Sequence, residues 1–433
     1  MHNVRLLCTR IFTDKVSGGN YMKKERSKIL LVMLLCITMI GTTLLSACSE
    51  PDPEEPEAPP CSPLTGETAE DGYDESSAER RVAAFVVENA PDARPQWGMD
   101  DENYPPDIIL QGEVEGGITR TLWFYADYEK LPEIIGPTRS ARPPFVRFSE
   151  LFDSIFIHWG MSHTEKGYVG ADRIFKKDKV DHIDQMKLDD KEDMYGRDST
   201  RDTGLEHRGI IYGGKVPATI GNLGFRTTPN DYTTFCFNRI TEPVSETAAT
   251  QVGVKYSDRA YEDTYWQYSE EDGMYHTSNF ENDLCRENLI VLSDETEYIT
   301  KEGYDGPGST GSVTYCDYKL GGGDGKLFSK GTVKDIKWQI VDGKLEIIDP
   351  STDAETAKTA NDENYAASLE AAKESEDGTW PIYNKYTIVS PDNDDDELTE
   401  EELANSYVLQ NLNKGKTWIG WISSNNGGSV SSH

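Results

Sequence analysis

Residues 81–88 read RVAAFVVE, an unbroken apolar run that marks the start of the folded part of the chain. A short continuous apolar run followed by turn residues is typical of a buried strand. The turn residues come at once, because residues 89–95 read NAPDARP. Two further strands are predicted at 107–111 and 118–125, on either side of a Gly-Gly turn.

A helix is predicted after these strands, at residues 143–151. Two prolines occupy its first turn, a position that tolerates proline, and Phe145, Phe148 and Phe152 fall on one face. A short buried strand is predicted next, at 154–158. Helix and strands therefore alternate irregularly along this part of the chain.

The remainder of the chain divides into a polar part and a strand-rich part. Residues 161–209 are polar and irregular, and a short helix is predicted at 216–223. From residue 251 onward, short alternating runs are separated by Gly or Asp turns, which is typical of a strand-dominated unit. The runs lie at 252–256, 263–269, 287–292, 312–319, 333–341, 344–348, 380–389 and 417–422.

The predicted fold class is α+β, with a mixed larger N-terminal domain followed by a smaller strand-rich C-terminal domain. We expect the first domain at about 81–245 and the second at about 250–422. Residues 350–405 are acidic and poor in apolar side chains, so they are interpreted as an insertion with solvated ends. Residues 423–433 are expected to form a flexible tail.

The chain upstream of the fold carries an export signal. Residues 22–28 are rich in Lys and Arg, residues 29–45 are apolar, and residues 45–48 read LSAC, a bacterial lipobox. A basic stretch, an apolar core and small residues at the cut define a secretory signal. A Cys directly after the cut makes it a lipoprotein signal. We therefore predict a signal peptide at 22–47 and acylation of Cys48, as by palmitate.

The segments around this signal have different predicted roles. Residues 1–21 show none of its features and are expected to be a leader that precedes the true start at Met22. Residues 48–80 begin with a Pro- and Glu-rich stretch and are predicted to be a disordered tether. The protein is thus expected at the cell membrane, anchored by lipid on the extracellular face.

The composition excludes several classes of function. The chain carries a net charge of −34, and a surface this acidic is repelled by nucleic acid and by anionic lipid. The bilayer is therefore expected to be a partner only through acylated Cys48. We expect neither a cofactor nor a metal site, because the cysteines show no metal-binding spacing. Cys285 and Cys316 could form a disulfide or could equally be buried free thiols.

Several motifs resemble one known family. They are residues 61–66 (CSPLTG), 89–96 (NAPDARPQ), 114–120 (VEGGITR) and 135–145 (IGPTRSARPPF), followed by weaker strand motifs up to Ile419. In this order they are similar to YerB-like lipoproteins of Gram-positive bacteria, and the GPxRSARP string is the specific part. The resemblance implies a two-domain fold and a place in the cell envelope. The family is a domain of unknown function, so the resemblance implies no reaction.

The densest group of candidate ligand-binding residues comprises Arg120, Arg139, Ser140, Arg142 and His158. Guanidinium groups bind carboxylate or phosphate with two parallel hydrogen bonds, so these residues predict an anionic ligand. The alternative is that the arginines pair internally, and the acids available for this are Asp92, Glu113 and Glu115.

A catalytic interpretation uses partly different residues. His158 or His207 could transfer protons beside a carboxylate, for which Glu115 and Asp198 are candidates. Ser140 lacks the G-x-S-x-G context of a nucleophile. A third interpretation takes exposed aromatic side chains as a sugar-binding platform, although most such side chains belong to cores. These aromatics are Trp97, Tyr104, Trp123 and Trp159.

These observations favour a non-enzymatic module of the cell envelope. It would bind an anionic wall component, such as a cell-wall polymer, or an envelope protein. The alternative is a cell-wall hydrolase or transferase that uses a His–carboxylate pair.

Overall fold

The computed structural model describes residues 60–165, 167–295, 297–306, 309–317, 320–374, 383–390 and 398–433. The predicted leader at 1–21, the signal peptide at 22–47 and the acylated Cys48 lie outside these residues. Within the described ranges, no helix is both long and apolar enough to cross a membrane.

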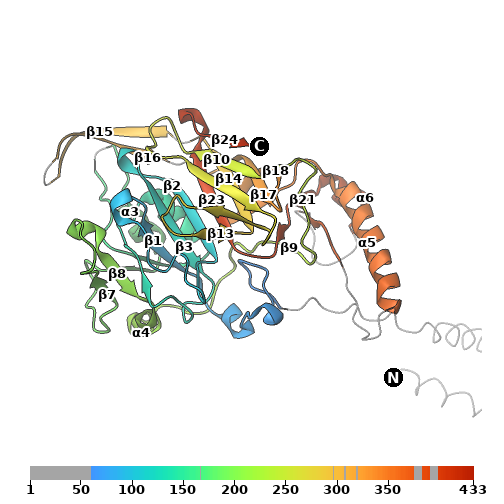
Figure 1. Ribbon diagram of the computed structural model, residues 1–433, viewed down its shortest axis with the longest axis horizontal. Coiled ribbons are helices and arrows are strands. Elements are labelled where there is room, and N and C mark those ends of the chain that lie inside the picture. Colours follow the sequence, from blue (N-terminus) through green and yellow to red (C-terminus); the bar gives the residue numbers. More distant parts are fainter. Residues whose placement is uncertain are drawn as a thin grey trace, which may run out of the picture. The chain divides into compact units, whose positions relative to one another are not determined.

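A twelve-stranded mixed sheet forms the centre of the fold (Figure 1). In the order in which they pair, its strands are β20 (Thr387–Val389), β21 (Tyr407–Leu409), β19 (Lys344–Ile348), β18 (Thr332–Val341), β17 (Gly322–Ser329), β14 (Asn288–Asp294), β23 (Thr417–Ser423), β2 (Ile108–Glu113), β3 (Thr119–Tyr125), β1 (Ala83–Glu88), β5 (Ile155–His158) and β6 (His182–Asp184). The strands predicted in the first half of the chain are confirmed as β1, β2, β3 and β5.

The α+β class is confirmed, and the sheet continues across the expected domain boundary. Strand β23, near the C-terminus, pairs in parallel with β2 of the first half and with β14 of the second half. Residues 58–433 form one compact unit. The boundary expected between residues 245 and 250 therefore lies between segments that contribute strands to the same sheet.

The central sheet is buried on both faces, which explains the unbroken apolar run at 81–88. Phe85 belongs to a core shared with a second sheet, and Val86 belongs to a core shared with helix α2. The same alternation occurs in β23. Trp418 packs against Trp266 with ring centroids 5.3 Å apart, and Trp421 packs against Phe148 of α2 at 5.4 Å.

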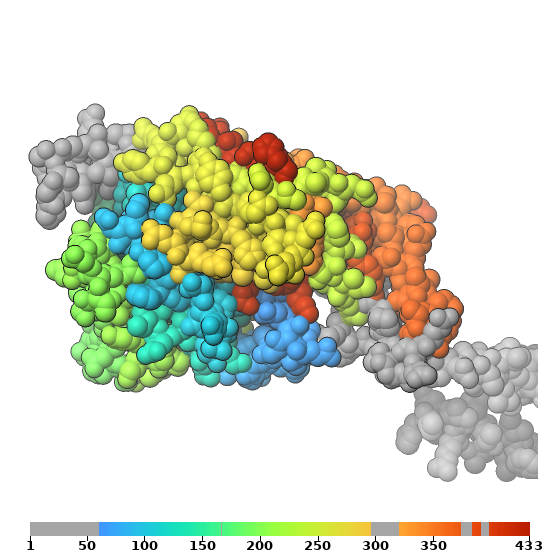
Figure 2. Space-filling view, in the orientation of Figure 1, coloured from blue at the N-terminus to red at the C-terminus, as the bar shows by residue number. Residues whose placement is uncertain are grey.

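A five-stranded antiparallel sheet covers one face of the central sheet. Figure 2 shows it mainly in yellow, with the red C-terminal strand at its edge. Its strands are, in order, β13 (Leu284–Arg286), β12 (Met274–Thr277), β11 (Thr264–Ser269), β10 (Gln251–Lys255) and β24 (Ser429–Ser432). The expectation of a flexible tail at 423–433 was therefore wrong, because the backbone of β24 pairs with that of β10.

Two helices pack toward the other face of the central sheet, and both contribute to the core shared with α2. Helix α2 (Pro143–Glu150) was predicted from its phenylalanines, whereas α3 (Ala171–Asp178) lies in the range that was expected to be irregular. That range also contains β6, β7 (Tyr195–Arg197) and β8 (Gly209–Tyr212). The predicted helix at 216–223 is confirmed as α4 (Val216–Leu223).

The remaining elements are peripheral. They are β4 (Ile134–Ile135), which pairs with β8; β9 (Phe237–Asn238) with β22 (Leu412–Asn413); β15 (Glu297–Gly306) with β16 (Ser309–Asp317); and helices α5 (Ala354–Glu374) and α6 (Glu400–Asn405). Helix α5 corrects the picture of a largely solvated acidic insertion, because its many Ala, Glu and Lys residues favour helix. Cys285 is a free thiol, so the possible disulfide with Cys316 is not formed.

Residues 61–79, called the strap below, are folded onto the domain, so the predicted tether does not extend to residue 80. Leu64 is fully buried, and Gly66 has a φ of +69° directly against Phe237. The carbonyl of Thr65 accepts a hydrogen bond of 2.8 Å from the amide of Gly415. The strap is short of apolar side chains, and this one buried leucine is its main anchor in the core.

Residues 136–142, called the corner loop below, are fixed by backbone contacts and by buried charges. The amide of Thr138 donates to the Gly209 carbonyl at 2.7 Å. Arg120 Nη1 donates to the Ser140 carbonyl, also at 2.7 Å. Arg142 closes the loop by binding both carboxylate oxygens of Glu115.

Replacing the buried strap leucine tests whether the strap is part of the fold. We expect Leu64→Ala to lower the free energy of unfolding by about 2–5 kcal/mol, because the change leaves a cavity in the core. Chemical denaturation measures this. The control Glu70→Ala alters an exposed strap residue and should have little effect. Equal stability of both variants would mean that the strap is a tether after all.

A second variant tests the buried charges behind the corner loop. Burial raises the pKa of Glu115, but the guanidiniums of Arg142 and Arg120 outweigh burial and lower the pKa from 4.5 to about 2. The ionised carboxylate therefore stabilises the fold above about pH 4.5, and this contribution is lost as the pH falls toward 2. We expect Glu115→Gln to cost up to about 3 kcal/mol at neutral pH.

The difference between Glu115→Gln and the unaltered protein should shrink in acid, as denaturation at several pH values would show. Glu129→Gln is the matched control, because Glu129 forms an exposed ion pair with Arg80 that contributes little. A pH-independent difference would contradict the electrostatic explanation.

Candidate functional site

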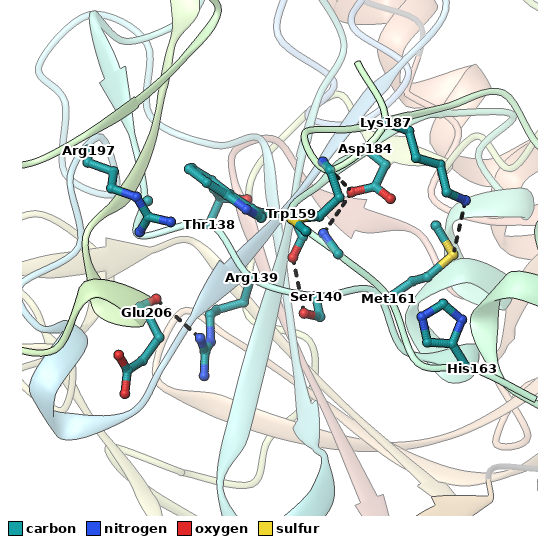
Figure 3. A pocket seen from close by; sticks show the side chains of 13 residues that line it. Thr138, Arg139, Ser140, Trp159, Met161, His163, Asp184, Lys187, Arg197 and Glu206 are labelled. Atoms are coloured by element: carbon teal, nitrogen blue, oxygen red, sulfur yellow. Dashed lines mark hydrogen bonds between the residues drawn. The ribbon is translucent and has the colours of Figure 1, made fainter. Parts of the chain in front are cut away.

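A cavity of about 510 Å³ lies where the corner loop, the end of β5 and residues 184–209 meet (Figure 3). Its lining residues are Thr138, Arg139, Ser140, Trp159, Gly160, Met161, His163, Asp184, Met186, Lys187, Arg197, Glu206 and Gly209. Gly209 has a specific role here, because a Cβ atom would stand 2.8 Å from the Trp159 ring. Glycine thus lets the indole lie against β8 and form part of the cavity wall.

Arg139 is the predicted ligand-binding arginine that lines this cavity. Its Nε lies 3.1 Å from Oε1 of Glu88, and its Nη1 donates to the Glu206 carbonyl at 3.2 Å. Glu88 is buried at the end of β1, and its other oxygen, Oε2, lies 3.0 Å from Nδ1 of His207. One buried carboxylate therefore holds both the arginine and the histidine in place.

Ser140 and His158 do not form a nucleophile–base pair. The Ser140 hydroxyl donates to the Trp159 carbonyl at 3.0 Å. The fully buried His158 ring contacts the Gly160 carbonyl through Nδ1 at 2.7 Å and His182 Nδ1 through Nε2 at 2.9 Å. Burial lowers the pKa of His158 to about 3, so this imidazole is neutral at ordinary pH.

Lys187 and Arg197 supply two further positive charges to the cavity, and the sequence analysis missed both. Among the described residues, neither has a carboxylate within the 4.0 Å of an ion pair. Arg197 stacks on Trp159, with its guanidinium carbon 4.5 Å from the ring centroid, and Lys187 Nζ lies 3.9 Å from the sulfur of Met161. Both residues come from the range that was expected to be irregular.

Arg120 and Arg142 lie outside the cavity lining, although the sequence grouped them with Arg139. Both pair with Glu115, as the alternative of internal pairing anticipated. Burial lowers the pKa of Arg120 to about 10. These two arginines thus support the corner loop from behind, while Arg139 and Ser140 present its opposite side to the cavity.

The residues of the catalytic interpretation are also dispersed among separate partners. His207 pairs with Glu88 rather than with Glu115 or Asp198. Asp198 accepts hydrogen bonds from Trp97 Nε1 at 2.8 Å and from the Thr200 amide at 2.8 Å, so it closes a turn. In the described part of the chain, no group of three His, Cys, Asp or Glu side chains is arranged to hold a metal ion.

The four candidate aromatic residues do not share one surface. Trp123 is fully buried in the core, and Trp159 lines the cavity. Tyr104 belongs to a different cavity, described below. The proposed sugar-binding platform is therefore not assembled from these side chains.

The comparisons with known proteins cover the cavity. Residues 64–223 match the family described as "Protein of unknown function (DUF3048) N-terminal domain". The chain is 35% identical over 158 residues to "Putative lipoprotein YerB" of Bacillus subtilis (strain 168). This match covers 36% of the chain and 43% of the relative, so it spans less than two thirds of the relative's length.

A solved structure extends the likeness to most of the fold. The crystal structure of the YerB protein from Bacillus subtilis superimposes with a TM-score of 0.55 at 21% identity, covering 86% of this chain and 99% of that one. Every residue that lines the cavity falls between 138 and 209, inside the matched family domain. The chain belongs to the YerB-like family, and residues 64–223 are its DUF3048 N-terminal domain.

Proposed function

We propose that this protein is a lipid-anchored module of the extracellular membrane face that binds an anionic component of the cell wall without cleaving it. The lipobox at 45–48 and the name of the curated relative support the lipoprotein part. The cavity beside the corner loop supports the binding part.

The observation that carries the binding proposal is the pair of cations without carboxylate partners, Lys187 and Arg197. In a chain with a net charge of −34, acidic side chains are abundant, so a cation that lacks one is unusual. Both charges line one cavity together with Arg139. A ligand carboxylate or phosphate placed there would gain charge-assisted hydrogen bonds without displacing an existing ion pair.

The apolar part of the lining narrows the class of ligand. Trp159, Met161 and Met186 line the same cavity, and Met186 is 68% exposed. Burial of these side chains favours a ligand that carries its anionic group on an apolar or amphipathic body. A lactyl-substituted sugar or a glycerol phosphate polymer has this combination.

An enzymatic alternative rests on the contact between His207 and Glu88 near the cavity. A histidine held by a buried carboxylate can act as a general base. Glu88 is also bound to Arg139, however, and a carboxylate shared in this way equally suits a structural role.

Sedimentation with isolated cell-wall sacculi tests the binding proposal. We expect the double variant Lys187→Gln/Arg197→Gln to reduce the bound fraction by about tenfold or more, because each charged hydrogen bond contributes on the order of 1.5–3 kcal/mol. The melting temperature should stay unchanged, since neither side chain holds an ion pair within the protein. Binding should also weaken as ionic strength rises.

Lys191→Gln is the matched control, because Lys191 is exposed and pairs with Asp189 at 3.4 Å. It removes a charge from the same segment and should leave sedimentation intact. Equal binding by the double variant and the control would contradict the proposed cavity. Release of defined wall fragments that disappears in His207→Ala would replace the binding proposal with the hydrolase.

The anchor requires a separate test. We expect Cys48→Ala to move the protein from the membrane fraction to the medium, because the acyl chains that bind the bilayer are attached to this thiol. Cys61→Ala is the control, since Cys61 is an exposed free thiol in the strap and should not affect anchoring. Membrane retention of Cys48→Ala, measured by fractionation and mass spectrometry, would contradict the lipid anchor.

A further inference from the structure

A second cavity, of about 320 Å³, has the opposite charge from the first. It lies between the strap, the loop before β2 and the end of β3. In Figure 2 the strap is the blue segment at the lower edge of the described part. The volume is at the lower end of the range for small-molecule sites, so only a compact ligand or group fits.

Most of the acidic side chains around this cavity are neutralised within the protein. Glu67 pairs with Lys416 at 3.2 Å, Asp71 with Lys414 at 2.7 Å, and Asp127 with Arg80 at 3.1 Å. These ion pairs hold the strap against β23 and the end of β3. They are structural, and they do not require a ligand.

Asp107 differs from these acids. Its Oδ2 accepts a hydrogen bond of 2.7 Å from the Ala126 amide. Within the described ranges, no Lys, Arg or His nitrogen lies within the 4.0 Å of an ion pair. A partly buried carboxylate without a cation is costly, and such a group normally has a partner.

The cavity also contains an unpartnered hydroxyl. Tyr125 is 2% exposed, it lines the cavity, and its Oη has no hydrogen-bond partner among the described residues. Buried polar atoms in native proteins are nearly always satisfied by protein, water or ligand. Tyr73 and Tyr104 line the same cavity, so three phenol rings surround one unpaired carboxylate.

We propose that this cavity binds an organic ammonium group, with Asp107 as its counter-ion and the rings of Tyr73, Tyr104 and Tyr125 as its wall. Aromatic rings around an acidic side chain are the chemistry that recognises ammonium ions, because the ring faces are electron-rich. A primary ammonium group would also donate to Tyr125 Oη. A quaternary group would use only the rings and the charge.

The protonation of Asp107 sets the pH dependence of binding. Burial raises its pKa to about 6, and the charges of Lys416 and Arg286, opposed by that of Glu67, act on it from the neighbouring elements. Only the ionised carboxylate attracts a cation. Binding is therefore retained above pH 6 and lost as the pH falls through 6.

Calorimetric titration of the purified protein with choline and with ethanolamine tests this site. We expect at least one of them to bind above pH 6 and to be lost below it. Asp107→Asn should weaken binding by about tenfold or more. The same variant should melt at an equal or higher temperature at neutral pH, because it removes a buried charge whose ionisation opposes folding.

Two further variants make the outcomes distinguishable. Asp74→Asn removes the same charge from an exposed position on the cavity rim and should leave binding intact, so equal losses would show that only net charge matters. Tyr125→Phe should weaken ethanolamine and spare choline if the hydroxyl accepts a hydrogen bond. Absence of binding by both amines, or binding of Ca²⁺ in their place, would overturn the proposal.

Discussion

The parallel pairing of β23 with β2 and with β14 is the constraint on which the rest of the structure depends. This strand lies near the C-terminus, yet it sits in the middle of the central sheet. Its two tryptophans point to opposite faces, Trp418 toward the five-stranded sheet and Trp421 toward α2. Removal of β23 would separate the two halves of the sheet and expose both cores. Folding of the first half is therefore expected to require the end of the chain.

The sequence predicted those parts of the fold that are held by apolar side chains. Strand β1 is an unbroken apolar run because both of its faces are buried, and α2 shows its phenylalanines on one face. Helix α3 was missed because its eight residues bury little beyond Ala171, Ile174 and Phe175 among charged neighbours. Strand β24 consists largely of serine, and backbone pairing with β10 holds it in place. Such pairing leaves no pattern in the side chains.

The candidate site was predicted only in part, for a related reason. The corner loop could be found from its arginines and prolines, and Arg139 and Ser140 do line a cavity. Residue types alone could not show that Arg142 is bound by Glu115 whereas Arg197 lacks a carboxylate. That distinction depends on which loops meet in space. Glu88 was likewise missed as the partner of Arg139, because a single acid at the end of a strand carries no signal.

The docked strap also limits how far the domain can stand from the bilayer. With Cys48 as the lipid anchor, the free chain between the membrane and the fold is only residues 49–60. Even fully extended, a segment of this length spans about 40 Å, whereas a tether reaching residue 80 would have spanned about 110 Å. A target anywhere beyond this short radius is out of reach. The partner of this protein must therefore itself approach the membrane surface.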